Sequence, residues 1–155
     1  MWAEEDFPLP RGVARLVELQ PEDNTCYVMF HGTTRQAAQQ IQAKGFRQSE
    51  DGMLGRGVYL SRDLDKARRY PLDILENQRV VIRVIVNVGR VKTIRYQAGM
   101  QKTWHDYGYD TAWVPANCGM VRSGLEENCV WDPKRITVQA IIKPKTQQPF
   151  YQGTW

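Results

Sequence analysis

The sequence lacks long apolar runs and a secretory leader, and each absence excludes a class of protein. No apolar stretch approaches the roughly 20 residues that a bilayer-spanning helix needs, which argues against a helical membrane protein. The N-terminal stretch from Met1 to Asp6 is acidic and has no apolar core of the kind that secretory signals carry. The chain is therefore expected to be cytoplasmic, with a size that permits entry into the nucleus, and to have no membrane partner.

Cysteine and histidine are scarce. The cysteines are Cys26, Cys118 and Cys129, none of them spaced as Cys-x-x-Cys, and only His31 and His105 could join them. A structural zinc site needs four ligands, usually in close pairs, so we expect no metal. An odd number of cysteines without a leader fits reduced thiols in the cytosol or nucleus.

Disordered tracts and a strong charge of one sign are also missing. Of the 155 residues, 42% are hydrophobic and 25% are charged, which is typical of a globular domain. The length matches one domain. We therefore expect a single domain over residues 1–155, with loose arms at 1–12 and 143–155. The net charge of +4 permits an anionic ligand but does not demand nucleic acid.

Hydrophobic patterning predicts several short strands and two helices. We expect strands at 14–19, 25–30, 55–60, 79–88, 91–96, 129–131 and 136–142, and helices at 34–44 and 63–70. Residues 47–54 are predicted to be a loop, and residues 97–124 show little periodicity. Because strands and helices do not alternate regularly, the pattern predicts an α+β fold with mainly antiparallel pairing.

The ends of the predicted helices carry recognisable capping residues. Thr34 is a candidate N-cap of the first helix, and Gly45 is placed for a left-handed C-cap. Asp63 or Ser61 is a candidate N-cap of the second helix, which Pro71 ends. The strand at 79–88 has the strongest pattern, with one apolar face formed by Val80, Ile82, Val84, Val86 and Val88.

Two kinds of aromatic residue are candidates for binding a ligand. His31 follows a buried strand and precedes Gly32, which favours a position at the rim of a cleft, although a histidine there also commonly bridges a strand end to a helix. Tyr59 and Tyr70 are suited to sandwich a flat aromatic ligand. Ordinary half-buried tyrosines are the alternative for this pair.

Glycines and acidic residues give weaker signals. Gly55-x-Gly57 falls short of a dinucleotide fingerprint, because Leu60 stands where the third glycine would fall. A tight turn into a strand is the alternative. Glu126 and Glu127 would point to opposite faces of a strand, so that one is solvated while the other faces a cleft. A charged strand entry is the alternative for both.

A basic cluster of Lys66, Arg68 and Arg69 lies on the second predicted helix. Such a run is usually a solvated face. Together with the Trp- and Tyr-rich segment 104–113 it is also suited to attract phosphates or a nucleic-acid strand.

The order of these motifs resembles the catalytic domain of the poly(ADP-ribose) polymerase (PARP) superfamily. The motifs are His31-Gly32-Thr33, Gly55-x-Gly57-x-Tyr59, a helix ending in Tyr70, and Glu127-x-x-Val130-Trp131-Asp132, and the match spans about residues 27–142. The chain is similar to the PARP-like Gig family in its small size and in the segment at 125–133, Leu-Glu-Glu-Asn-Cys-Val-Trp-Asp-Pro. Members of that family are virus- and interferon-inducible genes first named from grass carp reovirus infection.

The resemblance implies a fold, a cofactor and a site. The fold would be that of ADP-ribosyltransferases, with split antiparallel β-sheets and short flanking helices, and the cofactor would be NAD. The implied catalytic triad is His31, Tyr59 and Glu127, the glutamate being the one five residues before Asp132 rather than Glu126. The implied cofactor-binding residues are His31, Gly32, Thr33, Tyr59, Ala67 and Tyr70.

Each implied role has a physical basis. Glu127 near the ribose 2′-hydroxyl would stabilise positive charge as the glycosidic bond breaks. The cationic nicotinamide would stack between Tyr59 and Tyr70, with its amide held by the backbone of Gly32. His31 would donate a hydrogen bond to the adenosine ribose. Arg56 or Arg68 would face the pyrophosphate.

The sequence also departs from the family pattern. Ala67 stands where the family often has a serine that binds the nicotinamide amide, and the loop 47–54 that would cover NAD is short. The chain has no room for the helical regulatory domain of the DNA-dependent polymerases, so polymer elongation is not expected. The resemblance thus implies an NAD-dependent mono-ADP-ribosyltransferase in the antiviral response, with a protein acceptor favoured and a nucleic-acid acceptor allowed.

Two alternatives remain open at this point. One is an inactive PARP-like module that binds NAD, ADP-ribose or a protein partner, which Ala67 and the short loop favour. The other is a nucleic-acid binder that uses the basic and aromatic surface. For an active enzyme we expect Glu127→Gln to abolish transfer and Glu126→Gln to do little.

Overall fold

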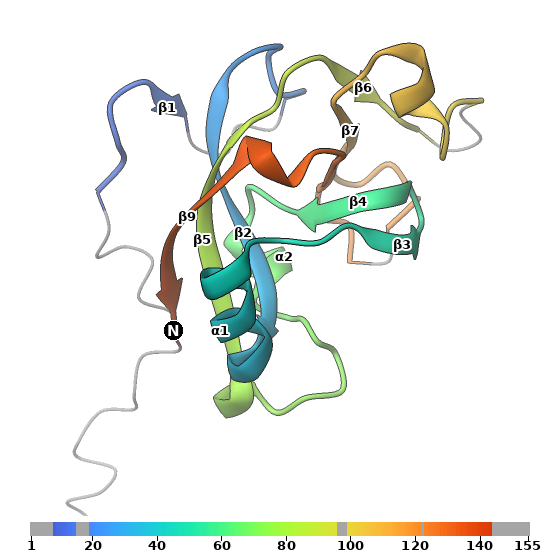
Figure 1. The fold of residues 1–155 in the computed structure, drawn as a ribbon. Helices are drawn as coiled ribbons and strands as arrows, with labels where there is room; N and C mark the ends of the chain where they lie inside the picture. The colour runs from blue at the N-terminus through green and yellow to red at the C-terminus, as the bar shows by residue number, and fades with distance from the viewer. Residues whose placement is uncertain (1–7, 15–18, 96–98, 122, 144–155) are drawn as a thin grey trace, which may run out of the picture.

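The computed structural model of the chain describes residues 8–14, 19–95, 99–121 and 123–143. These residues form two mixed sheets with few helices (Figure 1), so the predicted α+β class is confirmed. The strands are β1 (Val13–Ala14), β2 (Cys26–Thr34), β3 (Ser49–Gly52), β4 (Gly55–Leu60), β5 (Arg79–Asn87), β6 (Val91–Thr93), β7 (Thr111–Val114), β8 (Glu127–Val130) and β9 (Ile136–Ile142). The α-helices are α1 (Arg35–Lys44) and α2 (Leu64–Ala67), and the 3₁₀ turns are η2 (Glu76–Gln78), η3 (Trp104–Tyr107) and η4 (Pro133–Arg135).

The first sheet has four strands in the order β1-β2-β5-β9. Its centre is the antiparallel pair β2–β5, which runs without a register shift from Cys26 opposite Asn87 to Thr34 opposite Arg79. β1 pairs with β2 in parallel, and β9 pairs with β5 antiparallel. The apolar face predicted for this strand is confirmed, because all five predicted residues join the largest buried cluster: Val80, Ile82, Val84 and Val86 of β5, and Val88, which directly follows it.

The second sheet has five strands in the order β3-β4-β8-β7-β6, with only β6–β7 parallel. Sequence patterning missed two of these strands. β3 occupies the predicted loop 47–54, and β7 lies in the segment 97–124, where no element was expected. Every residue of β7 is buried, so it has no polar face to produce an alternating pattern.

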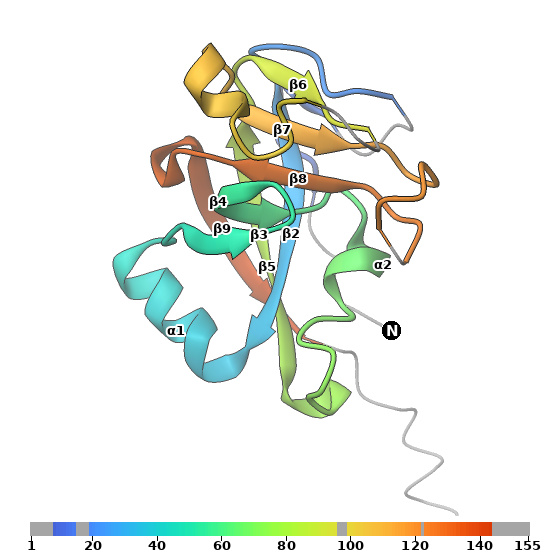
Figure 2. The same cartoon turned by 90° about the vertical axis from the view of Figure 1, so that its right-hand side faces the viewer.

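The two sheets are joined at their centre. Phe30 of β2 and Ser61, which directly follows β4, exchange both backbone hydrogen bonds, with N···O distances of 2.7 and 3.0 Å. The largest buried cluster takes side chains from both sheets, among them Met29 and Val84 from the first and Val58 and Val130 from the second. Figure 2 shows α1 and α2 on either side of β2. The described residues therefore pack as one unit.

The predicted cap positions are confirmed, although the second helix is shorter than expected. Thr34 accepts a hydrogen bond from the Ala37 backbone, and Gly45 ends α1 with φ of 84° and ψ of 174°, a positive-φ conformation other than the predicted left-handed αL one. Asp63 caps α2 through the Asp65 backbone. The expected helix 63–70 contains only a single turn of α-helix, at Leu64–Ala67.

Other boundaries differ by a few residues. β2 continues to Thr34, so the His-Gly-Thr motif lies in the strand rather than after it. Of the strand expected at 14–19, residues 15–18 lie outside the described residues, as does residue 96 of the strand expected at 91–96. The loose arms expected at 1–12 and 143–155 fall largely outside them too, but within the described part Pro8 accepts a hydrogen bond from Arg83. No helix in the described ranges has the length and apolarity to cross a bilayer.

Candidate active site

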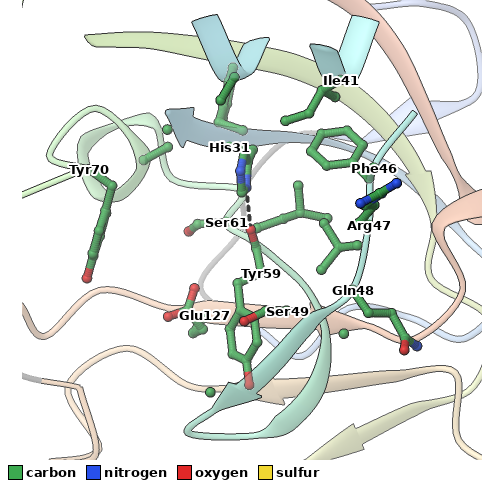
Figure 3. A pocket seen from close by; sticks show the side chains of 18 of the residues that line it. His31, Ile41, Phe46, Arg47, Gln48, Ser49, Tyr59, Ser61, Tyr70 and Glu127 are labelled. Atoms are coloured by element: carbon green, nitrogen blue, oxygen red, sulfur yellow. Dashed lines mark hydrogen bonds between the residues drawn. The ribbon is translucent and has the colours of Figure 1, made fainter. Parts of the chain in front are cut away.

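A cavity of about 710 Å³ lies between α1, the β3–β4 hairpin and α2 (Figure 3). Its volume falls in the range of small-molecule sites. Its floor includes the strand segment Phe30–Gly32, beside the point where β2 bridges to Ser61. One wall is the end of α1 with residues 45–49, and the opposite wall is α2 with Tyr70 and Glu127.

Most of the predicted site residues line this cavity: His31, Gly32, Tyr59, Ala67, Tyr70 and Glu127. In Figure 3, Glu127 lies between Tyr59 and Tyr70 in the view, with His31 above it. Thr33, which was predicted to bind the cofactor, is buried and does not belong to the lining.

The orientation of His31 is fixed by one hydrogen bond. Its Nδ1 lies 2.8 Å from the carbonyl oxygen of Tyr59. A carbonyl only accepts, so Nδ1 carries the proton and Nε2 of the neutral ring is an acceptor. Burial lowers the pKa of His31, which keeps the ring neutral. With this tautomer Nε2 of His31 can accept but cannot donate a hydrogen bond, so the predicted donor role does not fit the neutral ring.

Gly32 presents its backbone to the cavity. Phe30 uses its N–H and C=O on Ser61, on the edge of β2 that faces away from β5. Residues two apart in an antiparallel strand direct these groups to the same edge. The N–H and C=O of Gly32, which lies opposite Val81 in the same unbroken register, therefore point to this edge beside the cavity.

Close packing explains why position 32 is a glycine. A Cβ on Gly32 would lie 1.9 Å from the carbonyl oxygen of Ala67 and 2.9 Å from that of Tyr70. Both contacts are with backbone, which cannot turn aside. Gly32 thus lets the end of α2 approach β2 and form the wall of the cavity.

We predict that Gly32→Ala destabilises the protein by about 2–3 kcal/mol, because the new methyl group pushes α2 away from β2. Urea unfolding followed by circular dichroism measures this change. Gly99→Ala is the matched control, since a Cβ there meets nothing within 4 Å, and it should change stability by less than about 0.5 kcal/mol. Equal effects from both substitutions would show that the packing of α2 on Gly32 is not tight.

Tyr59 offers a ring face rather than a reactive hydroxyl. Its hydroxyl donates to the carbonyl of Gly55 at 2.6 Å and accepts from the backbone N–H of Leu54 at 2.9 Å. Burial raises the pKa of Tyr59, so the phenol stays neutral. The β3–β4 turn thereby holds the Tyr59 ring in the cavity wall, opposite the α2 side that carries Tyr70.

Glu127 contributes a carboxylate group to the lining of the cavity. Its Oε2 lies 3.4 Å from Nζ of Lys66, and the side chains of Glu127 and Lys66 are 17% and 3% exposed. Burial raises the pKa of Glu127 to about 6, and the nearby Lys66 ammonium opposes that rise. The group is therefore mostly ionised at neutral pH but within reach of protonation.

The basic cluster predicted on the second helix does not form a common surface. Lys66 is buried and lines the cavity. Arg68 pairs instead with Asp65 at 2.9 Å on the outside of the helix. The prediction of a solvated basic face is therefore wrong for Lys66.

Glu126 is buried, which corrects the expectation of a replaceable charge at the strand entry. It is 3% exposed, and its carboxylate pairs with Arg62 at 2.6 Å. It also accepts hydrogen bonds from the Arg62 backbone, Trp113 Nε1 and Asn128 Nδ2 at 2.7–2.8 Å. Neither glutamate is freely solvated: Glu126 holds the second sheet to Arg62, and Glu127 lines the cavity.

The cations that line the cavity are Lys44, Arg47 and Lys66. Arg56 and Arg68, which were the candidates for facing a pyrophosphate, do not belong to the lining. Sequence reasoning missed Lys44 and Arg47, although Gly45 signals that the chain turns at the end of α1. The available clue was the predicted C-cap at Gly45, because Lys44 directly precedes it and Arg47 follows it by two residues.

Comparison with models of known protein families finds no match for this sequence, and comparison with curated proteins finds none either. The site therefore has to be interpreted from its own geometry and from the motifs that carry the resemblance to PARP catalytic domains.

Proposed function

We propose that this chain is an NAD-dependent mono-ADP-ribosyltransferase with the fold of the PARP catalytic domain, similar to the Gig family and acting in the cytoplasmic antiviral response. The observation that carries the proposal is one cavity lined by His31, Tyr59 and Glu127, three residues far apart in the chain. The antiviral role and the Gig assignment rest on the motifs of the sequence alone.

The nicotinamide fits the part of the cavity between Tyr59 and Tyr70. A cationic ring gains from stacking on tyrosine faces. The edge of β2 at Gly32 supplies one N–H donor and one C=O acceptor, which match the oxygen and the NH₂ of a carboxamide. This pairing supports nicotinamide over a ring that lacks the amide.

Polar groups farther along the cavity suit the rest of NAD. Nε2 of His31 accepts a hydrogen bond from a ribose hydroxyl. Lys44 and Arg47, at the end of α1, are placed to offset the negative charge of the pyrophosphate. Together they replace the predicted roles of Arg56 and Arg68.

Glu127 faces the reacting ribose in this arrangement. The bond between the nicotinamide nitrogen and C1′ breaks, and its electron pair leaves with neutral nicotinamide. The Glu127 carboxylate accepts a hydrogen bond from the 2′-hydroxyl and stabilises positive charge on the ribose. An acceptor nucleophile, preferably on a protein, then forms the new bond to C1′ and loses its proton.

We predict an acid limb in the pH profile of transfer with a midpoint near pH 6, because the pKa of Glu127 is raised to about 6 and the reaction needs its carboxylate. The protonated form predominates below that pH, so the rate at pH 5 should be about tenfold below that at pH 7. Initial rates at saturating NAD over pH 4.5–8 test this prediction. A rate that stays constant across this pH range would show that transfer does not depend on the charge of Glu127.

The proposal is tested with NAD labelled in the adenylate moiety, incubated with purified protein alone and with cell lysate. Label should become covalently attached to protein or nucleic acid, with release of nicotinamide. If no label is transferred, and if neither NAD nor ADP-ribose stabilises the fold, the proposal is contradicted.

Ala67 supports a second function, a binding module without transfer. It lines the cavity where the family often has a serine, so one hydrogen bond to the amide is missing. Such a loss costs about 1 kcal/mol. A rise in melting temperature with ADP-ribose, without transfer of label, would favour this module.

A further inference from the structure

Lys66 is a buried cation inside the cavity wall. Its side chain is 3% exposed and extends from α2, which is a single helical turn. Three groups surround its ammonium: Oε2 of Glu127 at 3.4 Å, Oγ of Ser123 at 3.5 Å, and the ring of Tyr70, with 5.6 Å to the centroid. Of these three residues, Glu127 and Tyr70 line the cavity.

A lysine in this position needs an explanation. Burying an ammonium group costs free energy unless it is paired, and lysine is almost never fully buried without a partner. The exposed side of α2 was available, since Arg68 lies there with Asp65. Lys66 is instead directed at Glu127, the only carboxylate among the described residues that line the cavity.

We infer that Lys66 is a positioning residue that keeps the Glu127 carboxylate ionised and aimed into the cavity. The inference rests on the proposed function for its role in catalysis, but the contact between the two groups is independent of it.

The charges around Glu127 support this role. The titratable groups near it are Lys66 from α2, Tyr59 from β4, and Glu126 and Cys129 from its own segment. His31 lines the same cavity and is neutral. Lys66 is the only cation in this set, and burial together with the negative charge of Glu126 favours the protonated acid. The ammonium of Lys66 is therefore the group that opposes protonation.

Removing the cation has a specific expected effect. In Lys66→Met the titration midpoint of Glu127 should rise by at least about one pH unit, which places it near neutrality. Transfer should then fall about twofold at pH 7 and about fivefold at pH 6, and recover as the pH is raised to 9. Lys66→Arg keeps the charge and should preserve most of the activity at pH 7. A lysine that only fills space would give no such recovery at high pH.

The experiment combines two readouts. The first is ¹³C NMR titration of glutamate side chains labelled at Cδ, with Glu127 assigned by its loss in Glu127→Gln. The second is the pH profile of transfer. Arg68→Met is the matched control, since it removes a cation from the same segment that pairs with Asp65 and not with Glu127. It should leave both readouts at the wild-type values.

The outcomes are separable from those of the proposed function. A raised Glu127 midpoint in Lys66→Met, with the wild-type midpoint in Lys66→Arg and Arg68→Met, supports the inference. An unchanged midpoint in Lys66→Met overturns it. If the wild type transfers no label at any pH, the proposed function fails, while the NMR titration still decides whether Lys66 controls the Glu127 charge.

Discussion

Replacing Glu127 by glutamine is expected to slow ADP-ribosyl transfer by about 10²–10³-fold while the chain stays folded. Glutamine has the same shape but carries no negative charge to stabilise the ribose as nicotinamide leaves. Lys66 keeps its contact with Ser123 Oγ and gains an amide oxygen in place of the carboxylate, so the fold should lose only about 1 kcal/mol. Single-turnover transfer at saturating NAD measures the rate, and urea unfolding measures the stability.

Glu76→Gln is the control for this substitution, because Glu76 is exposed in η2, outside the cavity lining. It should transfer label at the wild-type rate. ADP-ribose should raise the melting temperature of Glu127→Gln about as much as that of the wild type. Full activity of Glu127→Gln would show that Glu127 has no role in the chemistry. The unfolding curve shows whether the variant is folded, so that a loss of activity through unfolding is recognised as such.

The neighbouring substitution, Glu126→Gln, is expected to destabilise the protein by about 3–5 kcal/mol. It removes the negative charge that compensates Arg62, and both side chains are almost fully buried. The new amide group would also direct N–H donors at a position already surrounded by donors from Arg62, Trp113 and Asn128. Urea unfolding at pH 7 measures the loss. This expectation reverses the one from sequence, which treated Glu126 as replaceable.

A double substitution tests whether the cost comes from the unpaired charge. Arg62→Met with Glu126→Leu removes both charges, and its destabilisation should be smaller than that of Glu126→Gln alone. Glu76→Gln again serves as the control and should change stability by less than about 0.5 kcal/mol. A destabilisation by Glu126→Gln as small as that of the control would mean that the buried pair contributes little.

Local signals in the sequence predicted much of the fold. The cap positions at Thr34, Gly45 and Asp63 were correct because each depends on a side chain or backbone angle within a few residues. The apolar face of β5 was correct because its alternation is long and regular. These features need no knowledge of distant parts of the chain.

The errors have a common physical origin. β7 has four residues, all buried, so the alternation that reveals a half-buried strand is absent. The position of Lys66 depends on Glu127 and Ser123, which are distant in sequence. The choice between Glu126 and Glu127 by motif spacing agreed with which glutamate lines the cavity, whereas the burial of Glu126 required knowing where Arg62 lies.

Adjacent glutamates with separate tasks have an evolutionary consequence. Glu126 secures the folded chain, and Glu127 provides the cavity carboxylate, so selection acts on the two codons for different reasons. Under the proposed function, a lineage would lose transferase chemistry by one change at position 127 and would still inherit a folded receptor for the nucleotide. Change at position 126 instead removes the protein as a whole. Inactive descendants of such a domain should therefore vary at the second glutamate and retain the first.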